Sequence, residues 1–77
     1  MIESVNCIQL PDLKRGDRRK EVKFYQILLN TYGFECGKAD GIFGEKTEKA
    51  TITFNKKFLG KNTGICNINT WLTLLNM

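Results

Sequence analysis

The stretch from Asp40 to Thr47 constrains the fold of this 77-residue chain more than any other, because it joins a tight turn to the start of a helix. Asp-Gly is a strong turn signal, since Gly41 can adopt a positive φ and the Asp40 carboxylate can accept a hydrogen bond from the backbone further on. Phe43 is the apolar residue between two glycines, and we expect it to point inward. Acidic residues follow Gly44 and suit the positive N-terminal end of a helix dipole, so we expect a helix to start there. The turn then sets the direction of that helix.

A weaker copy of this pattern lies nearer the C-terminus, over residues 63–70. The two copies share Gly, Ile and Thr in register, and Asn67 takes the place of Gly44. Asparagine tolerates the left-handed backbone region and is also a preferred helix cap. The repeat predicts two turn-to-helix elements in a compact helical domain, although a match this short also arises by chance.

Three amphipathic helices are predicted around these turns, at Arg18–Tyr32, Glu45–Phe58 and Ile68–Leu75. Apolar residues recur in them at spacings of three and four, and Gly33 and Gly60 follow the first two as helix-ending residues. The third helix is too short to be stable alone and must dock on the others. The residues expected to face the core are Val22, Phe24, Tyr25, Leu28, Leu29, Tyr32, Thr47, Ala50, Thr51, Phe54, Phe58 and Trp71.

The composition is ordinary for one globular domain, with 42% hydrophobic and 26% charged residues. We divide the chain into a lead-in, residues 1–12, and a single domain, residues 13–77. No apolar run approaches the roughly 20 residues that a membrane span requires, so no membrane partner is expected. The first residues lack the basic and apolar regions of a signal peptide. We therefore expect synthesis in the cytoplasm with release by another route, or a place within a longer protein.

The formal net charge of +4 favours an anionic partner, which includes nucleic acid, acidic membrane surfaces and anionic wall polymers. Much of the charge lies between Lys14 and Lys20, which we interpret as a solvated helix entrance in preference to a binding patch. Three cysteines, Cys7, Cys36 and Cys66, are widely spaced in a chain without histidine, so no zinc site is expected. We expect reduced, packed thiols, and a single disulfide remains an alternative.

The absence of histidine also excludes a Ser-His or Cys-His nucleophile pair and the histidine ligands of a wall-cleaving zinc enzyme. Glu35 and Asp40 are candidates for a glycosidase pair, but a domain of this size has little room to enclose a sugar ring between acid and base. We therefore interpret Asp40 as a turn-former. The sequence predicts a protein without catalytic activity, cofactor or metal.

The chain carries five ordered blocks of residues with compatible spacings. They are Leu13-Lys14-Arg15-Gly16-Asp17, Val22-x-x-Tyr25-Gln26-x-x-Leu29-Asn30-x-x-Gly33-Phe34, Asp40-Gly41-Ile42-Phe43-Gly44-x-x-Thr47-x-x-Ala50-x-x-x-Phe54, Gly64-Ile65 and Thr70-Trp71-x-x-Leu74. Over roughly residues 13 to 75 this set resembles the peptidoglycan-binding domain type 1 family. The resemblance implies an all-α, compact three-helix module, usually appended to bacterial or phage cell-wall hydrolases, that holds the enzyme on peptidoglycan. The chain departs from the family pattern at Arg19, Tyr25 and Asn55.

Binding of wall fragments calls for a shallow groove, because wall peptides and aminosugars present carboxylates, amides, hydroxyls and apolar sugar faces. The candidate ligand-binding residues are Tyr32, Phe34, Asp40, Gly41, Ile42, Phe43, Thr47 and Trp71. For each of them a purely structural role is the stronger expectation, with Phe43 and Trp71 in the core. Tyr32 and Asp40 are the preferred binding candidates.

The leading hypothesis is a non-catalytic module that targets a cell-wall hydrolase, from a phage endolysin or a bacterial autolysin, to peptidoglycan. One alternative is a small basic nucleic-acid-binding domain, because three helices and a positive charge also describe helix-turn-helix proteins. The predicted third helix argues against it, since it carries Ile68, Trp71 and Leu72 where base-reading side chains are needed. A further alternative is a prodomain-like regulatory module of a hydrolase, although the cysteine-switch motif of metalloproteinase prodomains is missing.

Overall fold

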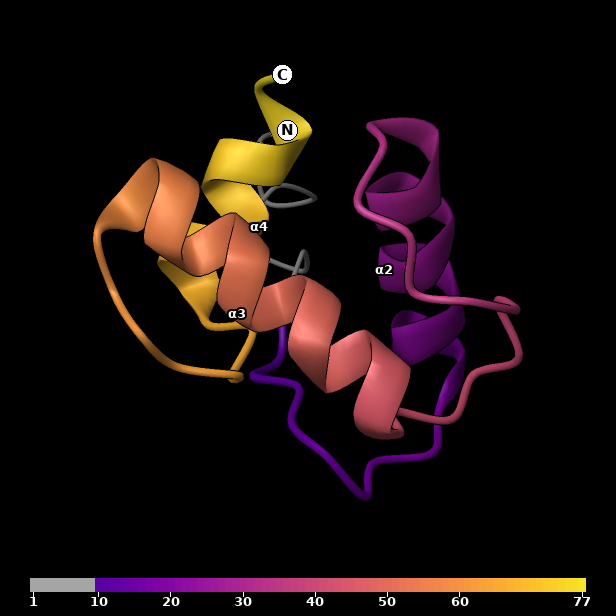
Figure 1. The fold of residues 1–77 in the computed structure, drawn as a ribbon. Helices are drawn as coiled ribbons and strands as arrows, with labels where there is room; N and C mark the ends of the chain where they lie inside the picture. The colour runs from indigo at the N-terminus through magenta and orange to yellow at the C-terminus, as the bar shows by residue number, and fades with distance from the viewer. Residues whose placement is uncertain (1–9) are drawn as a thin grey trace, which may run out of the picture.

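A computed structural model describes residues 10–77, which form three helices joined by long loops (Figure 1). α2 spans Lys20–Thr31, α3 spans Glu45–Leu59 and α4 spans Ile68–Leu75. Over the described range there is no extended strand, only two isolated β-bridges. The predicted all-α fold with three helices is confirmed. Most of the predicted lead-in lies outside the described residues, as does Cys7.

Glycines end the first two helices, as predicted. After α2, Gly33 has a φ of +89°, and the Phe34 backbone N–H donates to the Leu29 carbonyl at 2.8 Å. After α3, Gly60 has a φ of +66° and closes the last turn in the left-handed conformation. α2 begins at Lys20, two residues later than predicted, because Arg19 is still extended with a φ of −166°.

The core lies where α2, α3 and α4 meet the loops, and large side chains from all three helices fill it. Trp71 of α4 is 1% exposed, packs edge-on against Tyr25 at 5.5 Å, and donates its indole N–H to the Pro11 carbonyl at 2.8 Å. Phe43, from the loop before α3, is fully buried and stacks on Tyr25 at 6.1 Å. The predicted inward Phe43 and the predicted Trp71 wedge are therefore observed.

Three residues predicted to face the core are half exposed instead. Phe24 is 49% exposed, and Tyr32 and Phe58 are each 40% exposed. Phe24 covers the outer face of Trp71 at 6.0 Å, so it lies at the edge of the core. The buried face of α2 contains fewer apolar residues than predicted, because the polar residue Gln26 occupies part of that face and is only 1% exposed.

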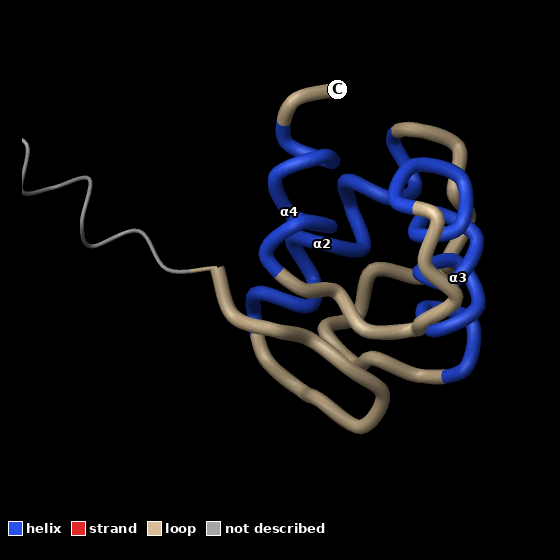
Figure 2. The backbone as a smooth tube through the Cα atoms, turned by 90° about the vertical axis from the view of Figure 1, so that its left-hand side faces the viewer, coloured by secondary structure: helices blue, strands red, loops and turns tan. Residues whose placement is uncertain are grey.

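Residues 13–18 join the two loops that precede α3 and α4. Leu13 exchanges backbone hydrogen bonds with Cys66, at 2.9 and 2.8 Å, and Arg18 forms a bridge with Ile42. Figure 2 shows these loop segments gathered at one end of the helices. The segment therefore holds together two loops that are more than twenty residues apart in the sequence.

Candidate functional site

The Gln26 side chain organises the loop that leads into α3. Its amide nitrogen donates to the Ile42 carbonyl at 3.0 Å and to the Thr47 hydroxyl at 2.9 Å, and its amide oxygen accepts from the Gly41 backbone N–H at 2.9 Å. The side chain is 1% exposed. Because a buried amide costs free energy unless its hydrogen bonds are made, this arrangement fixes the loop in one conformation.

The Asp40–Gly41 turn has the geometry that the sequence predicts. Gly41 has a φ of +81°, and the Ile42 backbone N–H donates to the Asp40 carboxylate at 2.9 Å. This hydrogen bond, with a smaller contribution from Gln26, lowers the pKa of Asp40 below its usual value. Asp40 is thus an exposed carboxylate that is both ionised at neutral pH and held in place by the turn.

Asn55 of α3 hydrogen-bonds the loop before α4, as Gln26 of α2 hydrogen-bonds the loop before α3. Its amide nitrogen donates to the Ile65 carbonyl at 3.0 Å, and its amide oxygen accepts from the Thr70 hydroxyl at 2.7 Å. Ile65 and Thr70 are the counterparts of Ile42 and Thr47 in the sequence repeat. The same positions of both copies are thus held by a buried amide, although Gln26 donates to the Thr47 hydroxyl whereas Asn55 accepts from the Thr70 hydroxyl.

The two copies share an extended backbone at the residue before the helix and differ in its cap, which corrects one expectation. Asn67 has a φ of −98°, so it does not use the left-handed region, and its side chain caps α4 by accepting from the Thr70 N–H at 3.0 Å. Gly44 has a φ of −105° and offers no side-chain cap to α3. Gly64 is needed for space, because an added Cβ would lie 2.7 Å from the Glu48 side chain.

A surface depression of about 350 Å³, here called the first hollow, opens beside the Asp40 turn and the start of α3. Among the predicted site residues, Asp40, Ile42 and Thr47 line it. The lining also includes Gln26, Cys36, Lys38, Gly44, Glu45 and Lys46. The lining thus combines exposed ammonium and carboxylate groups with the nearly buried Gln26 and Thr47, which suits a polar ligand with charges of both signs.

A depression of about 330 Å³, here called the second hollow, lies between the loop after α2 and the middle of α3. It is lined by Gly33, Phe34, Glu35, Lys49, Ala50, Thr53 and Lys57. The half-buried Phe34 ring packs edge-on against Phe54 at 5.1 Å, and the Lys57 ammonium lies 6.0 Å from its centroid. Of the predicted site residues, only Phe34 lies here.

The other predicted site residues line neither hollow. Tyr32 is exposed near the C-terminal end, where its hydroxyl donates to the Met77 carbonyl at 3.3 Å. Phe43 and Trp71 are buried and support the loops from within. Gly41 presents its backbone N–H to Gln26 and its carbonyl to the Arg19 N–H, so both groups are already paired.

Sequence reasoning did not select the two lysines of the first hollow, Lys38 and Lys46, or the two anchoring amides. A signal for the amides was present, because Gln26 and Asn55 each follow an aromatic residue in a buried helical stripe. A polar residue at a core position of a helix needs partners, and a loop that crosses the helix supplies them. The lysines carried no such signal, because exposed lysines occur throughout the chain.

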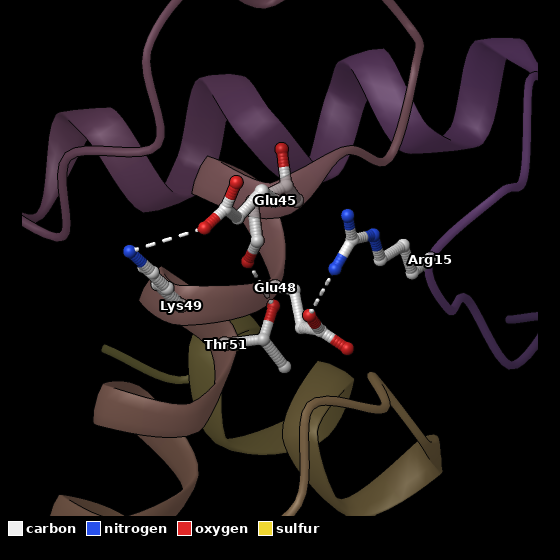
Figure 3. A network of polar contacts seen from close by, with 6 residues as sticks. Arg15, Glu45, Glu48, Lys49 and Thr51 are labelled. Atoms are coloured by element: carbon white, nitrogen blue, oxygen red, sulfur yellow. Dashed lines mark hydrogen bonds and ion pairs between the residues drawn. The ribbon is translucent and has the colours of Figure 1, made fainter.

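Three of the basic residues between Lys14 and Lys20 form ion pairs, one of them with a residue of α3. Arg15 contacts Glu48 at 3.1 Å, and Arg19 contacts Glu21 at the same distance. In Figure 3, Arg15 and Lys49 lie on opposite sides of α3, with Lys49 paired to Glu45 at 3.3 Å. Pairing of this kind supports the interpretation of the cluster as a solvated helix entrance.

The two cysteines among the described residues are buried free thiols. Burial raises the pKa of both Cys36 and Cys66, so neither is a reactive thiolate at neutral pH. Residues 10–77 contain no group of three or more acidic or thiol side chains arranged to hold a metal ion. Within the same range, no helix has both the length and the apolar character needed to cross a membrane.

Comparison with known proteins decides the family. A family model described as "Putative peptidoglycan binding domain" matches residues 18–74. The chain belongs to this family. The family assignment implies that the domain acts at the cell wall.

Solved structures of similar proteins agree with this assignment. The SleB N-terminal domain superposes with a TM-score of 0.82 at 30% identity, over 91% of this chain and 96% of that one. A peptidoglycan-binding protein from Clostridioides difficile, in complex with glutamine hydroxamate, gives 0.78 at 37% identity over 84% of this chain. The endolysin of Burkholderia phage AP3 gives 0.77 at 31% identity over 83% of this chain. The domain spans only 40% and 24% of the last two proteins.

Proposed function

We propose that the domain is a non-catalytic targeting module, which binds peptidoglycan at the first hollow and holds a cell-wall hydrolase on its substrate. The observation that carries the proposal is that two lysines and two carboxylates, Lys38, Lys46, Asp40 and Glu45, line the first hollow together. Wall peptides carry amines, carboxylates and amides, which are the partners that such a surface can bind.

The protonation states of the described residues favour binding over catalysis. A general acid needs a raised carboxyl pKa, whereas the pKa of Asp40 is lowered. A thiol nucleophile needs a lowered pKa, whereas burial raises the pKa of Cys36, the thiol that lines the first hollow. Neither Asp40 as a general acid nor Cys36 as a nucleophile is therefore activated in the first hollow.

The proposed tethering agrees with the architecture of similar proteins. The Clostridioides difficile protein and the phage endolysin are much longer than the region they share with this domain. A shallow site binds with an affinity of about micromolar to millimolar, and a repeating polymer raises the effective concentration once a tethered partner is engaged. We therefore place the module in an endolysin or autolysin, whose catalytic part gains residence time on the wall.

The nucleic-acid alternative finds little support in the surface of α4. Its exposed residues include Ile68, Leu72 and Leu75, and α4 carries no charged residue. A recognition helix reads base edges with polar and basic side chains, and it contacts phosphates through Lys and Arg.

Co-sedimentation with purified, insoluble peptidoglycan tests the proposal. The domain should sediment with the wall material at low salt, and the double substitution Lys38→Gln and Lys46→Gln should reduce the bound fraction several-fold. The double substitution Lys56→Gln and Lys61→Gln is the matched control, because it removes the same charge. Both residues are exposed, and neither lines a hollow. Absence of sedimentation at high protein concentration would contradict binding, and turbidity loss of a wall suspension with this domain alone would contradict the non-catalytic role.

A further inference from the structure

The two hollows lie on one seam, between residues 33–44 and α3. On the side of the loop, the second hollow is lined by Gly33, Phe34 and Glu35, and the first by the residues that follow, Cys36 and Lys38. On the side of α3, here called the helix wall, residues 44–47 line the first hollow and residues between 49 and 57 line the second. The two depressions are therefore neighbours along the seam.

The loop and the helix are in contact between the hollows. Gly37 has a φ of +82°, and a Cβ added to it would lie 3.1 Å from Cδ of Lys46. The loop backbone thus passes directly over the Lys46 stem, which makes a narrow neck. Asn30 holds the loop there by donating to the Gly37 carbonyl at 2.9 Å and accepting from the Cys36 N–H at 2.9 Å.

Three lysines follow the helix wall of the seam. Lys46, Lys49 and Lys57 lie within about 80° of one another around α3, at 100° per residue. Lys46 and Lys57 are eleven positions apart, which corresponds to about 16 Å along the helix. An extended peptide covers that distance with roughly five residues.

The second hollow combines an apolar floor with a cationic rim. Ala50 and Phe34 supply the apolar surface, and Lys49 and Lys57 supply the ammonium groups. Among residues 10–77, Lys57 contacts no carboxylate, and its ammonium lies over the rings of Phe34 and Phe58 at 6.0 and 5.6 Å. Lys49 pairs only with the exposed Glu45, and Glu35 is the one carboxylate on the rim.

We infer that the second hollow binds the C-terminal end of a wall stem peptide whose preceding residues occupy the first hollow. The terminal carboxylate lies between Lys49 and Lys57, and a small apolar side chain, such as that of alanine, packs on Phe34 and Ala50. This inference rests on the proposed peptidoglycan binding and adds the peptide stem, with its free carboxylate, as the part recognised.

Titration calorimetry with two synthetic probes tests the inference. One is a stem pentapeptide that ends in D-Ala-D-Ala with a free carboxylate, and the other is the same peptide as its C-terminal amide. The domain should bind the free acid about five- to tenfold more tightly than the amide. The double substitution Lys49→Gln and Lys57→Gln should remove this preference, whereas Lys56→Gln with Lys61→Gln should retain it.

Several outcomes would overturn the inference without touching the proposed function. Equal binding of acid and amide would do so, and so would equal losses in the two double variants, which would show a general charge effect. Tighter binding of a glycerol phosphate oligomer than of the peptide would assign the lysines to a phosphodiester polymer instead. Failure of the unsubstituted domain to sediment with whole peptidoglycan would instead count against the proposed function itself.

Discussion

Two buried amides, Gln26 and Asn55, determine the shape of the loops that carry the site. Each belongs to a helix and hydrogen-bonds a loop carbonyl and a threonine hydroxyl of the next helix. No buried side-chain nitrogen or oxygen among the described residues lacks a partner. Polar groups at core positions therefore act here as connectors between a helix and the loop that follows it.

We expect Gln26→Ala to destabilise the domain by about 2–3 kcal/mol, because it leaves the buried Thr47 hydroxyl and the Gly41 N–H without their partner. Urea denaturation followed by circular dichroism measures the change. Lys23→Ala, at an exposed position of the same helix, should stay within about 0.5 kcal/mol of the unsubstituted domain. Equal stabilities of the two variants would contradict the connecting role of Gln26.

At the scale of elements, α3 and α4 begin with the same local sequence pattern but with different caps. Asn67 accepts a hydrogen bond from the Thr70 N–H, whereas Gly44 leaves the first turn of α3 without a side-chain partner. A Cβ added at Gly44 would meet nothing within 4 Å. The position therefore has room for the cap that α4 already uses.

Replacing Gly44 by the residue of the second copy, Gly44→Asn, should raise the free energy of unfolding by a few tenths of a kcal/mol. The reciprocal test, Asn67→Ala, should lower it by about 1 kcal/mol, since the cap of α4 is lost. Thermal denaturation of both variants measures these opposite shifts. A stability loss in Gly44→Asn would indicate that the start of α3 tolerates no side chain.

The elements themselves were largely predictable from sequence, because each rests on local chemistry. Gly33 and Gly60 ended α2 and α3 where expected, and Asp40 with Gly41 formed the expected turn. The seam between the hollows was not predictable, because it depends on how closely the loop at Gly37 approaches Lys46 of another element. Distances of that kind follow from packing across the whole domain, which sequence periodicity does not encode.

At the scale of the whole molecule, the titrating groups divide into two sets. The pKa values of Asp40 and Glu21 are lowered in the folded state, mainly by hydrogen bonds from the backbone. The pKa values of Tyr25, Cys36 and Cys66 are raised by burial. The chain has no histidine, so no side chain has an ordinary pKa between about 5 and 8.

These shifts predict a stability plateau between about pH 5 and 8. A lowered carboxyl pKa contributes stability above its unfolded value, and that stability is lost as the pH falls below about 4. A raised thiol pKa contributes stability below its unfolded value, and that stability is lost as the pH rises above about 8.5. Urea denaturation across this range measures both limbs of the profile.

Single substitutions identify the groups responsible for each limb. Asp40→Asn should flatten the acid limb, and Cys66→Ala should flatten the alkaline limb while lowering the plateau, because it also removes buried volume. A profile of unchanged shape in either variant would assign that limb to other groups.

The pairing of Leu13 with Cys66 and of Arg18 with Ile42 has a practical consequence for protein engineers. A graft that starts at residue 18, where the family match begins, keeps α2, α3 and α4 but discards Leu13, whose backbone hydrogen bonds tie the loop before α4 to the rest of the domain. A chimeric lysin that is to retain wall affinity should therefore inherit this module from Pro11 onward, including the carbonyl that receives the Trp71 indole.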